Sequence, residues 1–143
     1  RGSLDFTYLP PSTVYLQLTG NSLRGSLDLT VFPEGLRGAT MDQNDYDGEI
    51  SLEHLPSTLE LLEISQNHLK GTVNLTKLPK SLEELYLSKN EFEGTVDLTH
   101  LPSNMRALSI AWNAFEGMTD FSQLPEKLDF LNVCETQLSG DIV

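Results

Sequence analysis

The stretch Gly71–Glu93, which reads GTVNLTKLPKSLEELYLSKNEFE, decides the fold of this chain. Its first glycine, its proline and its second asparagine each recur every 23 residues along the sequence. The glycines are Gly2, Gly25, Gly48, Gly71, Gly94, Gly117 and Gly140, and the prolines are Pro10, Pro33, Pro56, Pro79, Pro102 and Pro125. Because three residue types keep one register without an insertion, the chain is a tandem array.

The register divides the chain into six repeats, which are residues 2–24, 25–47, 48–70, 71–93, 94–116 and 117–139, followed by a partial seventh. A coil of 23 residues cannot bury its own apolar face, so stacked neighbours must share one core. We therefore expect residues 1–143 to form a single solenoid, and we interpret it as a segment of a longer protein.

Each repeat contains one predicted strand. Residues 84–88 alternate polar and apolar apart from Tyr86, as a half-buried strand does, with Leu85 and Leu87 directed inward. Equivalent strands are expected at 15–19, 38–42, 61–65, 84–88, 107–111 and 130–134. A proline within every return segment predicts an extended or turn-like path with little helix. The predicted fold class is an α/β-type solenoid that is mostly β, a right-handed horseshoe with six parallel strands on its concave face.

An asparagine follows each of the first five predicted strands, where the chain turns and leaves backbone groups without partners. A buried amide both donates and accepts, so it can satisfy such groups in neighbouring coils. The sequence predicts a structural ladder of these residues, which are Asn21, Asn44, Asn67, Asn90 and Asn113. Two coils depart from the pattern, because Thr136 replaces the sixth asparagine and Ala39 and Met41 occupy inward positions of the second strand.

The motif LxxLxLxxNxF, carried by Leu59–Leu69, Leu82–Phe92 and Met105–Phe115, resembles the leucine-rich-repeat superfamily. The LSGDI segment Leu138–Ile142 is similar to plant-type repeats, which carry LxGxIP after the asparagine. The chain departs from that class, with Val-Asp or Leu-Asp in place of Ile-Pro and a coil about one residue shorter. Leu78–Asn90 looks like bacterial effector repeats, and arrays of unicellular eukaryotes are closest in style. The resemblance implies protein recognition, usually on the concave sheet.

The composition excludes several classes of partner. The net charge of −12 and the pI near 4.4 argue against nucleic acids and anionic membranes, which need clustered basic residues. No apolar run approaches the ~20 residues that span a bilayer, so we expect no membrane insertion. The single cysteine, Cys134, cannot form an intrachain disulfide. Cytoplasmic and cell-surface locations both fit this sequence, and the acidity allows a basic partner while also serving solubility.

No catalytic constellation is recognisable, so we expect no enzyme activity, no cofactor and no metal. His54 and His100 share a register two coils apart, His68 lies in another, and none is placed to activate Cys134.

Two further patterns concern the turns of the coils. Aspartates recur in one register, interrupted by Ser51 and Asn74; the aspartates are Asp5, Asp28, Asp97 and Asp120. Turn capping explains this register better than calcium, because Asp, Asn and Ser are interchangeable only as caps. Asn74-Leu75-Thr76 is also a glycosylation sequon, relevant only to a secreted protein.

Aromatic side chains are expected on the outward face of three successive coils, as Tyr86, Trp112 and Phe130. Binding surfaces favour such residues, so we predict a partner site here, with Asn132 in the same area and Glu63 and Asp42 as acidic flanks. Generic surface exposure, or contact with another domain, would explain the same pattern.

The leading hypothesis is therefore a module that recognises a protein through the concave surface. Two alternatives are a structural or cell-surface spacer array and a targeting segment of a larger protein.

Overall fold

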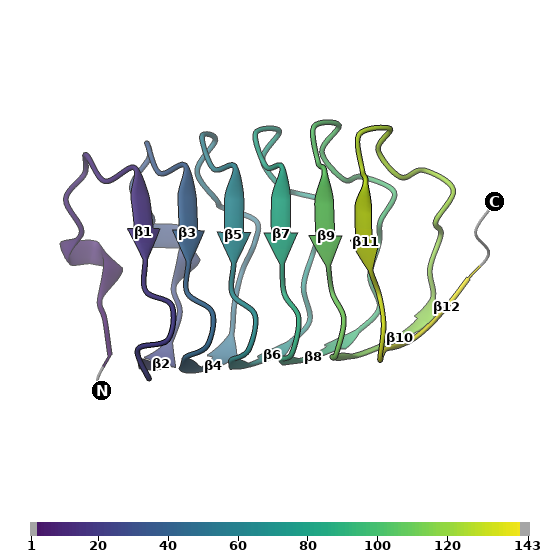
Figure 1. Ribbon diagram of the computed structural model, residues 1–143, viewed down its shortest axis with the longest axis horizontal. Coiled ribbons are helices and arrows are strands. Elements are labelled where there is room, and N and C mark those ends of the chain that lie inside the picture. Colours follow the sequence, from purple (N-terminus) through teal and green to yellow (C-terminus); the bar gives the residue numbers. More distant parts are fainter. Residues whose placement is uncertain (1–2, 141–143) are drawn as a thin grey trace.

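The computed structural model describes residues 3–140, so Gly2 of the first predicted repeat and residues 141–143 of the partial seventh lie outside it. Within this range the chain winds as a right-handed solenoid (Figure 1), and its strands alternate between two parallel sheets that we name sheet A and sheet B. The mostly β solenoid predicted from the repeat is thereby confirmed. None of the helices in residues 3–140 is long and apolar enough to cross a membrane.

Sheet A contains the predicted strands in sequence order. They are β1 (Tyr15–Gln17), β3 (Gly38–Thr40), β5 (Leu61–Glu63), β7 (Glu84–Tyr86), β9 (Ala107–Ser109) and β11 (Phe130–Asn132). Each residue pairs with the one 23 positions along, as Leu62 does with Leu85. The strands are shorter than the predicted five residues, but the hydrogen bonding continues past them. For example, the Leu87 N–H donates to the Ser109 carbonyl at 2.8 Å, and the Lys89 N–H donates to the Ala111 carbonyl at 3.0 Å.

Sheet B was not predicted, because the return side was expected to be only extended or turn-like. Its strands are β2 (Arg24–Ser26), β4 (Asp45–Glu49), β6 (His68–Gly71), β8 (Glu91–Gly94), β10 (Ala114–Met118) and β12 (Gln137–Ser139). The triplets that follow the ladder asparagines, such as Glu91-Phe92-Glu93, place an apolar residue between two polar ones, which is a short strand pattern. Gly94 weakens this strand pattern in the sequence, because glycine is depleted in strands. The structure requires glycine at this position, because its φ of 85° is readily adopted only by glycine.

The return segments contain little helix, as predicted. The two 3-10 helices in residues 3–140 are η1 (Phe6–Tyr8) and η2 (Leu29–Val31), each of three residues. The repeated proline begins a turn that leads into sheet A, because its carbonyl accepts the N–H three residues later. In the fourth coil this bond joins the Pro79 carbonyl to the Leu82 N–H at 3.0 Å.

The core lies between the two sheets and runs continuously through the coils. Inward residues of sheet A such as Leu62, Leu85 and Leu108 have no exposed surface. Opposite them, the rings of Phe92 and Phe115 from neighbouring strands of sheet B stack with centroids 6.2 Å apart. Stacking neighbours therefore bury what no single coil could bury alone.

The second coil contains one polar atom that the core leaves unsatisfied. Tyr46 is fully buried, and within residues 3–140 its hydroxyl has no hydrogen-bond partner. Burial raises the pKa of this phenol, because the ionised form would lose its hydration. Ala39 and Met41 of the same coil are also fully buried.

We expect Tyr46→Phe to increase the free energy of unfolding by about 1–3 kcal/mol, because it removes a buried hydroxyl that has no partner. Urea denaturation followed by circular dichroism measures the change. Met41→Leu in the same coil is the control, and this apolar exchange should cost less than about 1.5 kcal/mol. Destabilisation by Tyr46→Phe would show that the hydroxyl is hydrogen-bonded in solution.

Candidate binding surface

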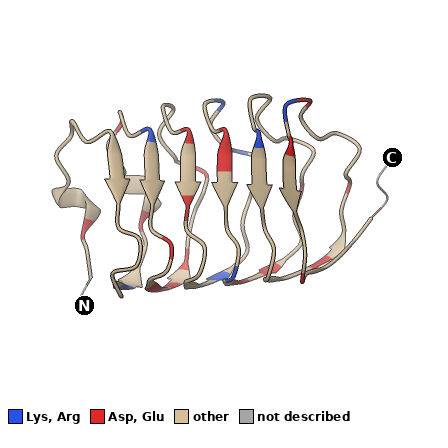
Figure 2. Cartoon of the chain, viewed as in Figure 1, with Lys and Arg blue, Asp and Glu red and all other residues tan. Residues whose placement is uncertain are grey.

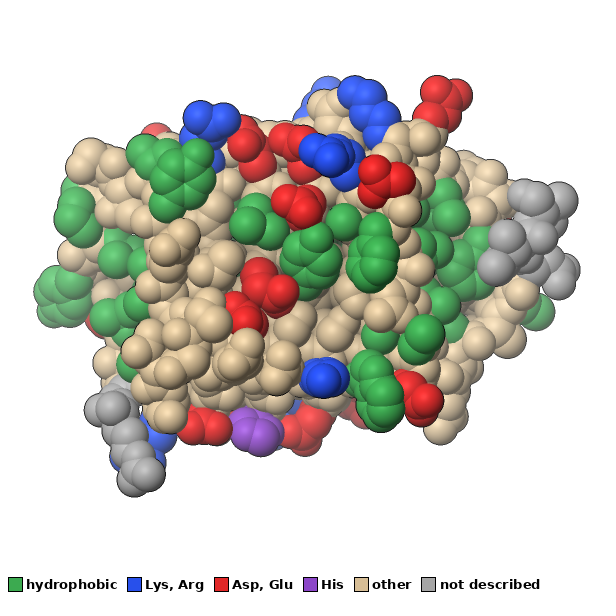
Figure 3. All heavy atoms as spheres, in the orientation of Figure 1, with side chains coloured by type: hydrophobic (Ala, Val, Ile, Leu, Met, Phe, Trp, Pro, Cys, Tyr) green, Lys and Arg blue, Asp and Glu red, His purple; other side chains and the backbone are tan. Residues whose placement is uncertain are grey.

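The outward side chains of sheet A form the candidate binding surface. Hydrophobic side chains gather over this sheet with acidic side chains among them (Figure 3), and acidic residues mark β5 and β7 (Figure 2). One line of paired residues crosses all six strands at their first positions, and we name it the entrance row: Tyr15, Gly38, Leu61, Glu84, Ala107 and Phe130.

The asparagines after the sheet A strands hold the turns at the exit side of this surface. Asn67 is buried, and its amide nitrogen donates to the carbonyls of Met41 at 3.1 Å, Ile64 at 3.1 Å and Ser65 at 3.2 Å. Its amide oxygen accepts the Tyr46 N–H at 3.1 Å, so one side chain ties together two adjacent coils. Asn44, Asn90 and Asn113 make equivalent bonds.

The two ends of the ladder are bonded differently. Asn21 is exposed, and within residues 3–140 its amide nitrogen donates only to carbonyls of its own coil, those of Leu18 and Thr19. Thr136 makes one bond, from its hydroxyl to the Val133 carbonyl at 2.8 Å, where an asparagine would make several.

The residue before each asparagine, or before Thr136, has a left-handed backbone, and we name this set the exit row: Gly20, Gln43, Gln66, Lys89, Trp112 and Glu135. The φ of Lys89 and of Trp112 is 56°. This conformation was not predicted from the sequence, although glycine at position 20 was a signal for it. Since every coil adopts it, the positive φ of Trp112 belongs to the fold, and the turn projects its side chain outward.

Because left-handed backbone disfavours side chains with a Cβ, Lys89→Gly should stabilise the protein by up to about 1 kcal/mol, and Lys89→Val should destabilise it by a similar amount. Thermal denaturation of the two variants checks the order. A stability lower for Lys89→Gly than for Lys89→Val would contradict the left-handed assignment of this row.

The structure places the three predicted aromatic residues on the sheet A side, at different ends of their strands. Trp112 is 52% exposed at the exit row, and Phe130 is 47% exposed in the entrance row. Tyr86 was expected to point freely to solvent but is half-buried, and its hydroxyl donates to the Glu84 carboxylate at 2.8 Å. Burial and this bond raise the pKa of Tyr86 to about 12. The shorter side chains of Ala107 and Ser109, both buried, lie on the strand between Tyr86 and Phe130.

The predicted polar flanks are held by short local bonds. Glu63 is half-buried and accepts the Ser65 N–H at 2.8 Å; burial raises the pKa of this carboxyl, and the charge of Asp42 adds to the effect. Asp42 accepts the Thr19 hydroxyl at 2.7 Å. Asn132 in β11 accepts the Cys134 N–H at 3.1 Å through its side chain.

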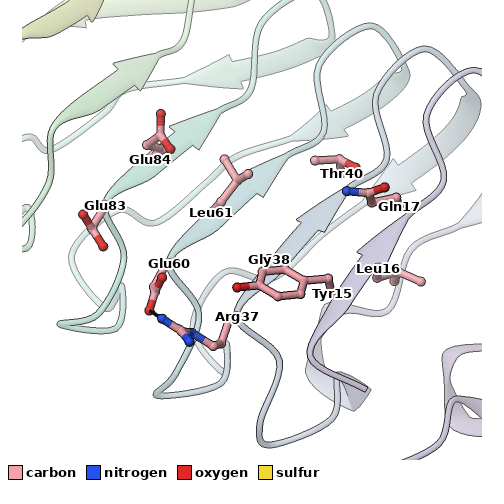
Figure 4. Close-up of a pocket in the computed structure, with 10 residues that line it drawn as sticks. All are labelled: Tyr15, Leu16, Gln17, Arg37, Gly38, Thr40, Glu60, Leu61, Glu83 and Glu84. Atoms are coloured by element: carbon pink, nitrogen blue, oxygen red, sulfur yellow. Dashed lines mark hydrogen bonds and ion pairs between the residues drawn. The ribbon is translucent and has the colours of Figure 1, made fainter. Parts of the chain in front are cut away.

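The structure also reveals a hollow in sheet A that was not predicted from the sequence. It encloses about 240 Å³ around the entrance row of the first four coils (Figure 4). Tyr15 lies along one wall, Leu61 and Glu84 line the other side, and the Arg37–Glu60 ion pair at 2.8 Å borders it. The signal in the sequence was Gly38, the one glycine in the entrance row.

The repeated aspartates act as turn caps in the structure. The side chains of Asp5, Asp28, Asn74, Asp97 and Asp120 each accept the N–H of the residue two positions later. For Asp5, Asp97 and Asp120 these bonds and the adjacent hydroxyl lower the carboxyl pKa. The amide nitrogen of Asn74, in the sequon, donates to Glu53 at 2.6 Å.

The histidines and the cysteine do not converge. His68 lies on sheet B, with its ring nitrogens 3.6 Å from an Asp45 oxygen and 3.5 Å from a Glu91 oxygen. His100 contacts Thr99 and Asp97, while Cys134 is an exposed free thiol on the sheet A side. Within residues 3–140 no group of three or more histidine, cysteine or acidic side chains could hold a metal ion.

Fold and surface together define a parallel β-solenoid repeat protein. Residues 81–108 match the family model described as Leucine Rich Repeat. The chain is similar to the ectodomain of the receptor kinase SOBIR1 from Arabidopsis thaliana, with 25% identity, a TM-score of 0.72, and coverage of 91% of this chain and 72% of that one. It is also similar to the plant peptide hormone receptor RGFR1, solved in complex with RGF2, with 25% identity and a TM-score of 0.67.

That second alignment covers 99% of this chain and 24% of the receptor, so the chain spans about a quarter of its length. No curated protein sequence matches the chain. The family match and the two structural matches support the leucine-rich-repeat superfamily for this chain, with repeats of about 23 residues. The general role of this fold is protein–protein interaction, and its members are typically non-enzymatic binding modules.

Proposed function

We propose that this chain is a non-enzymatic recognition module that binds a protein or peptide through the sheet A surface. The observation that carries the proposal is the exposure of large aromatic side chains on that surface. Trp112 and Phe130 keep about half of their surface in contact with solvent, at 52% and 47%. The fold does not require aromatic residues there, since the exit row elsewhere holds Gly, Gln, Lys and Glu.

A peptide ligand is supported by the comparison with RGFR1, a plant peptide hormone receptor whose structure was solved in complex with RGF2. The charge of the chain supports a ligand that is neutral or basic. The net charge is −12, and Glu63 pairs with Tyr86 on the neighbouring strand while the charge of Asp42 acts on Glu63, so an acidic ligand would be repelled. Nucleic acid and anionic membrane surfaces are poor partners for the same reason.

The test is affinity capture with a folded triple variant, Tyr86→Ala, Trp112→Ala and Phe130→Ala. Interface hot spots lose ~2 kcal/mol or more on truncation, so we expect at least tenfold less of each specific partner on the triple variant than on the wild type. Quantitative mass spectrometry measures the captured proteins, and circular dichroism verifies the fold.

A second triple variant, Leu4→Ala, Tyr8→Ala and Met118→Ala, is the matched control. These residues are exposed hydrophobics outside sheet A, with Tyr8 85% and Met118 79% exposed. This control should retain every partner. If partners survive the sheet A variant and are lost with the control, recognition uses another face, as a spacer array would.

A further inference from the structure

The hollow in sheet A exists because one outward side chain is missing from the entrance row. A Cβ on Gly38 would lie 3.1 Å from Cδ1 of Tyr15, so the Tyr15 ring leans over the space that a side chain at position 38 would occupy. Gly38 is not in the left-handed region, in contrast to Gly48 and Gly71, so its backbone conformation accepts other residues. The effect of Gly38 is therefore on the shape of the surface, through its missing side chain, and not on the backbone conformation.

The lining of the hollow combines apolar walls with an excess of negative charge. Tyr15 and Leu61 supply ring and aliphatic surface, and Tyr15 is 63% exposed. The charged residues are one cation, Arg37, and three carboxylates, Glu60, Glu83 and Glu84, which gives a net charge of −2. Arg37 is engaged by Glu60 through two hydrogen bonds, from Nη2 at 2.8 Å and from Nε at 3.1 Å. Glu84 and Glu83 therefore define the electrostatic character of the remaining space.

We propose that this hollow is the subsite for an arginine side chain of an extended peptide or protein segment bound on sheet A. The proposal rests on the proposed function and names the chemistry of its ligand. The volume of the hollow, about 240 Å³, lies below the ~300–1,000 Å³ typical of small-molecule sites and suits a single side chain. The aliphatic part of an arginine fits against Leu61, and the guanidinium faces the carboxylates.

Arginine fits this lining better than lysine does. A planar guanidinium stacks on an aromatic ring and binds carboxylates through two parallel hydrogen bonds, whereas an ammonium is a more strongly hydrated point charge. The exposed ring of Tyr15 offers the stacking surface. Glu84 remains an acceptor, since the hydrogen bond from Tyr86 uses only Oε1.

The entrance row also sets the spacing of the ligand. Leu61, which lines the hollow, and Phe130 occupy the same row, three strands apart. At ~4.8 Å per strand this separation is ~14 Å, and an extended peptide advances ~3.3 Å per residue. A segment lying along the row would therefore place an apolar residue at Phe130 about four residues from its arginine.

The experiment is selection of peptides from a displayed library of random 12-residue sequences on the immobilised chain, followed by affinity measurements on the synthetic consensus peptide. We expect the selected sequences to be enriched in arginine, with an apolar residue about four positions away. Replacing that arginine by citrulline, which keeps the shape without the charge, should weaken binding at least tenfold in fluorescence anisotropy.

Three protein variants locate the effect. Gly38→Leu puts a side chain into the hollow and displaces the Tyr15 ring without changing any charge. Glu84→Gln removes one charge while keeping an acceptor, and both variants should weaken the arginine peptide at least fivefold. On Gly38→Leu the arginine and citrulline peptides should bind equally. Glu116→Gln, an exposed acid in β10 of sheet B, is the charge-matched control and should change the affinity less than twofold.

The outcomes separate this inference from the proposed function. Selected peptides without arginine, or equal binding to Gly38→Leu and wild type, would overturn the arginine subsite. If the selected peptides bind the wild type but not the Tyr86, Trp112 and Phe130 triple variant, the proposed recognition on sheet A is retained and only the arginine subsite is rejected. Selection of no peptide at all, or of peptides that bind every sheet A variant equally, would count against both.

Discussion

Replacing Asn67 by alanine is expected to lower the free energy of unfolding by about 3 kcal/mol or more. The buried Tyr46 N–H would lose its acceptor, and an unsatisfied buried group costs about 1–3 kcal/mol. The two N–H groups of the Asn67 amide would also stop donating to the carbonyls of Met41, Ile64 and Ser65, and each N–H group contributes about 0.5–1.5 kcal/mol. Urea denaturation monitored by circular dichroism measures the change.

Asn21→Ala is the matched control, because it removes the same residue type from the first coil. Asn21 is exposed, and water can replace its two bonds to the carbonyls of Leu18 and Thr19. Its loss should cost less than about 1 kcal/mol. Similar losses for the two variants would mean that the asparagines act locally and do not connect adjacent coils.

Leu85→Ala should destabilise the protein several times more than Tyr86→Ala. Leu85 has no exposed surface and packs in the core shared by adjacent coils, where truncation of a leucine costs about 2–5 kcal/mol. Tyr86 is the next residue on the same strand, but its side chain lies on the outward face and stays half-buried. Its truncation removes the bond to Glu84 and a partly buried ring, so we expect about 1 kcal/mol.

Thermal denaturation of both variants under identical conditions tests this comparison. The pair is informative because the side-chain direction in a strand reverses at every residue. Equal shifts in Tm would show that the strand register assigned to β7 is wrong.

Sheet A could be predicted from the sequence because the residue pattern that specifies its strands is strong and local. Leu85 and Leu87 alternate with residues that are polar apart from Tyr86, and two apolar inward residues return at these positions in every coil, so the period of the strand and the period of the array agree. The lack of helix followed from the prolines, since Pro79 and its equivalents interrupt every return segment.

The features that were missed depend on neighbouring coils. The strands of sheet B are short and contain glycines such as Gly94, which disfavour a strand in isolation, and pairing with adjacent coils is what stabilises them. The hollow depends on how Tyr15 lies against Gly38, residues 23 positions apart in the sequence. The partial burial of Tyr86 likewise comes from the side chains around it, which no alternation pattern specifies.

In sheet A each strand residue pairs with the one 23 positions along, and this constant register has an evolutionary consequence. Exchange or duplication of one whole coil within an array leaves every turn, ladder bond and core contact with an equivalent partner, whereas insertion of a single residue would reverse the facing of all that follows in its strand. The outward residues of sheet A can thus be recombined in units of one coil. Exchange of a gene segment of 69 nucleotides, three for each of the 23 residues, would replace one set of outward side chains while the scaffold stays the same.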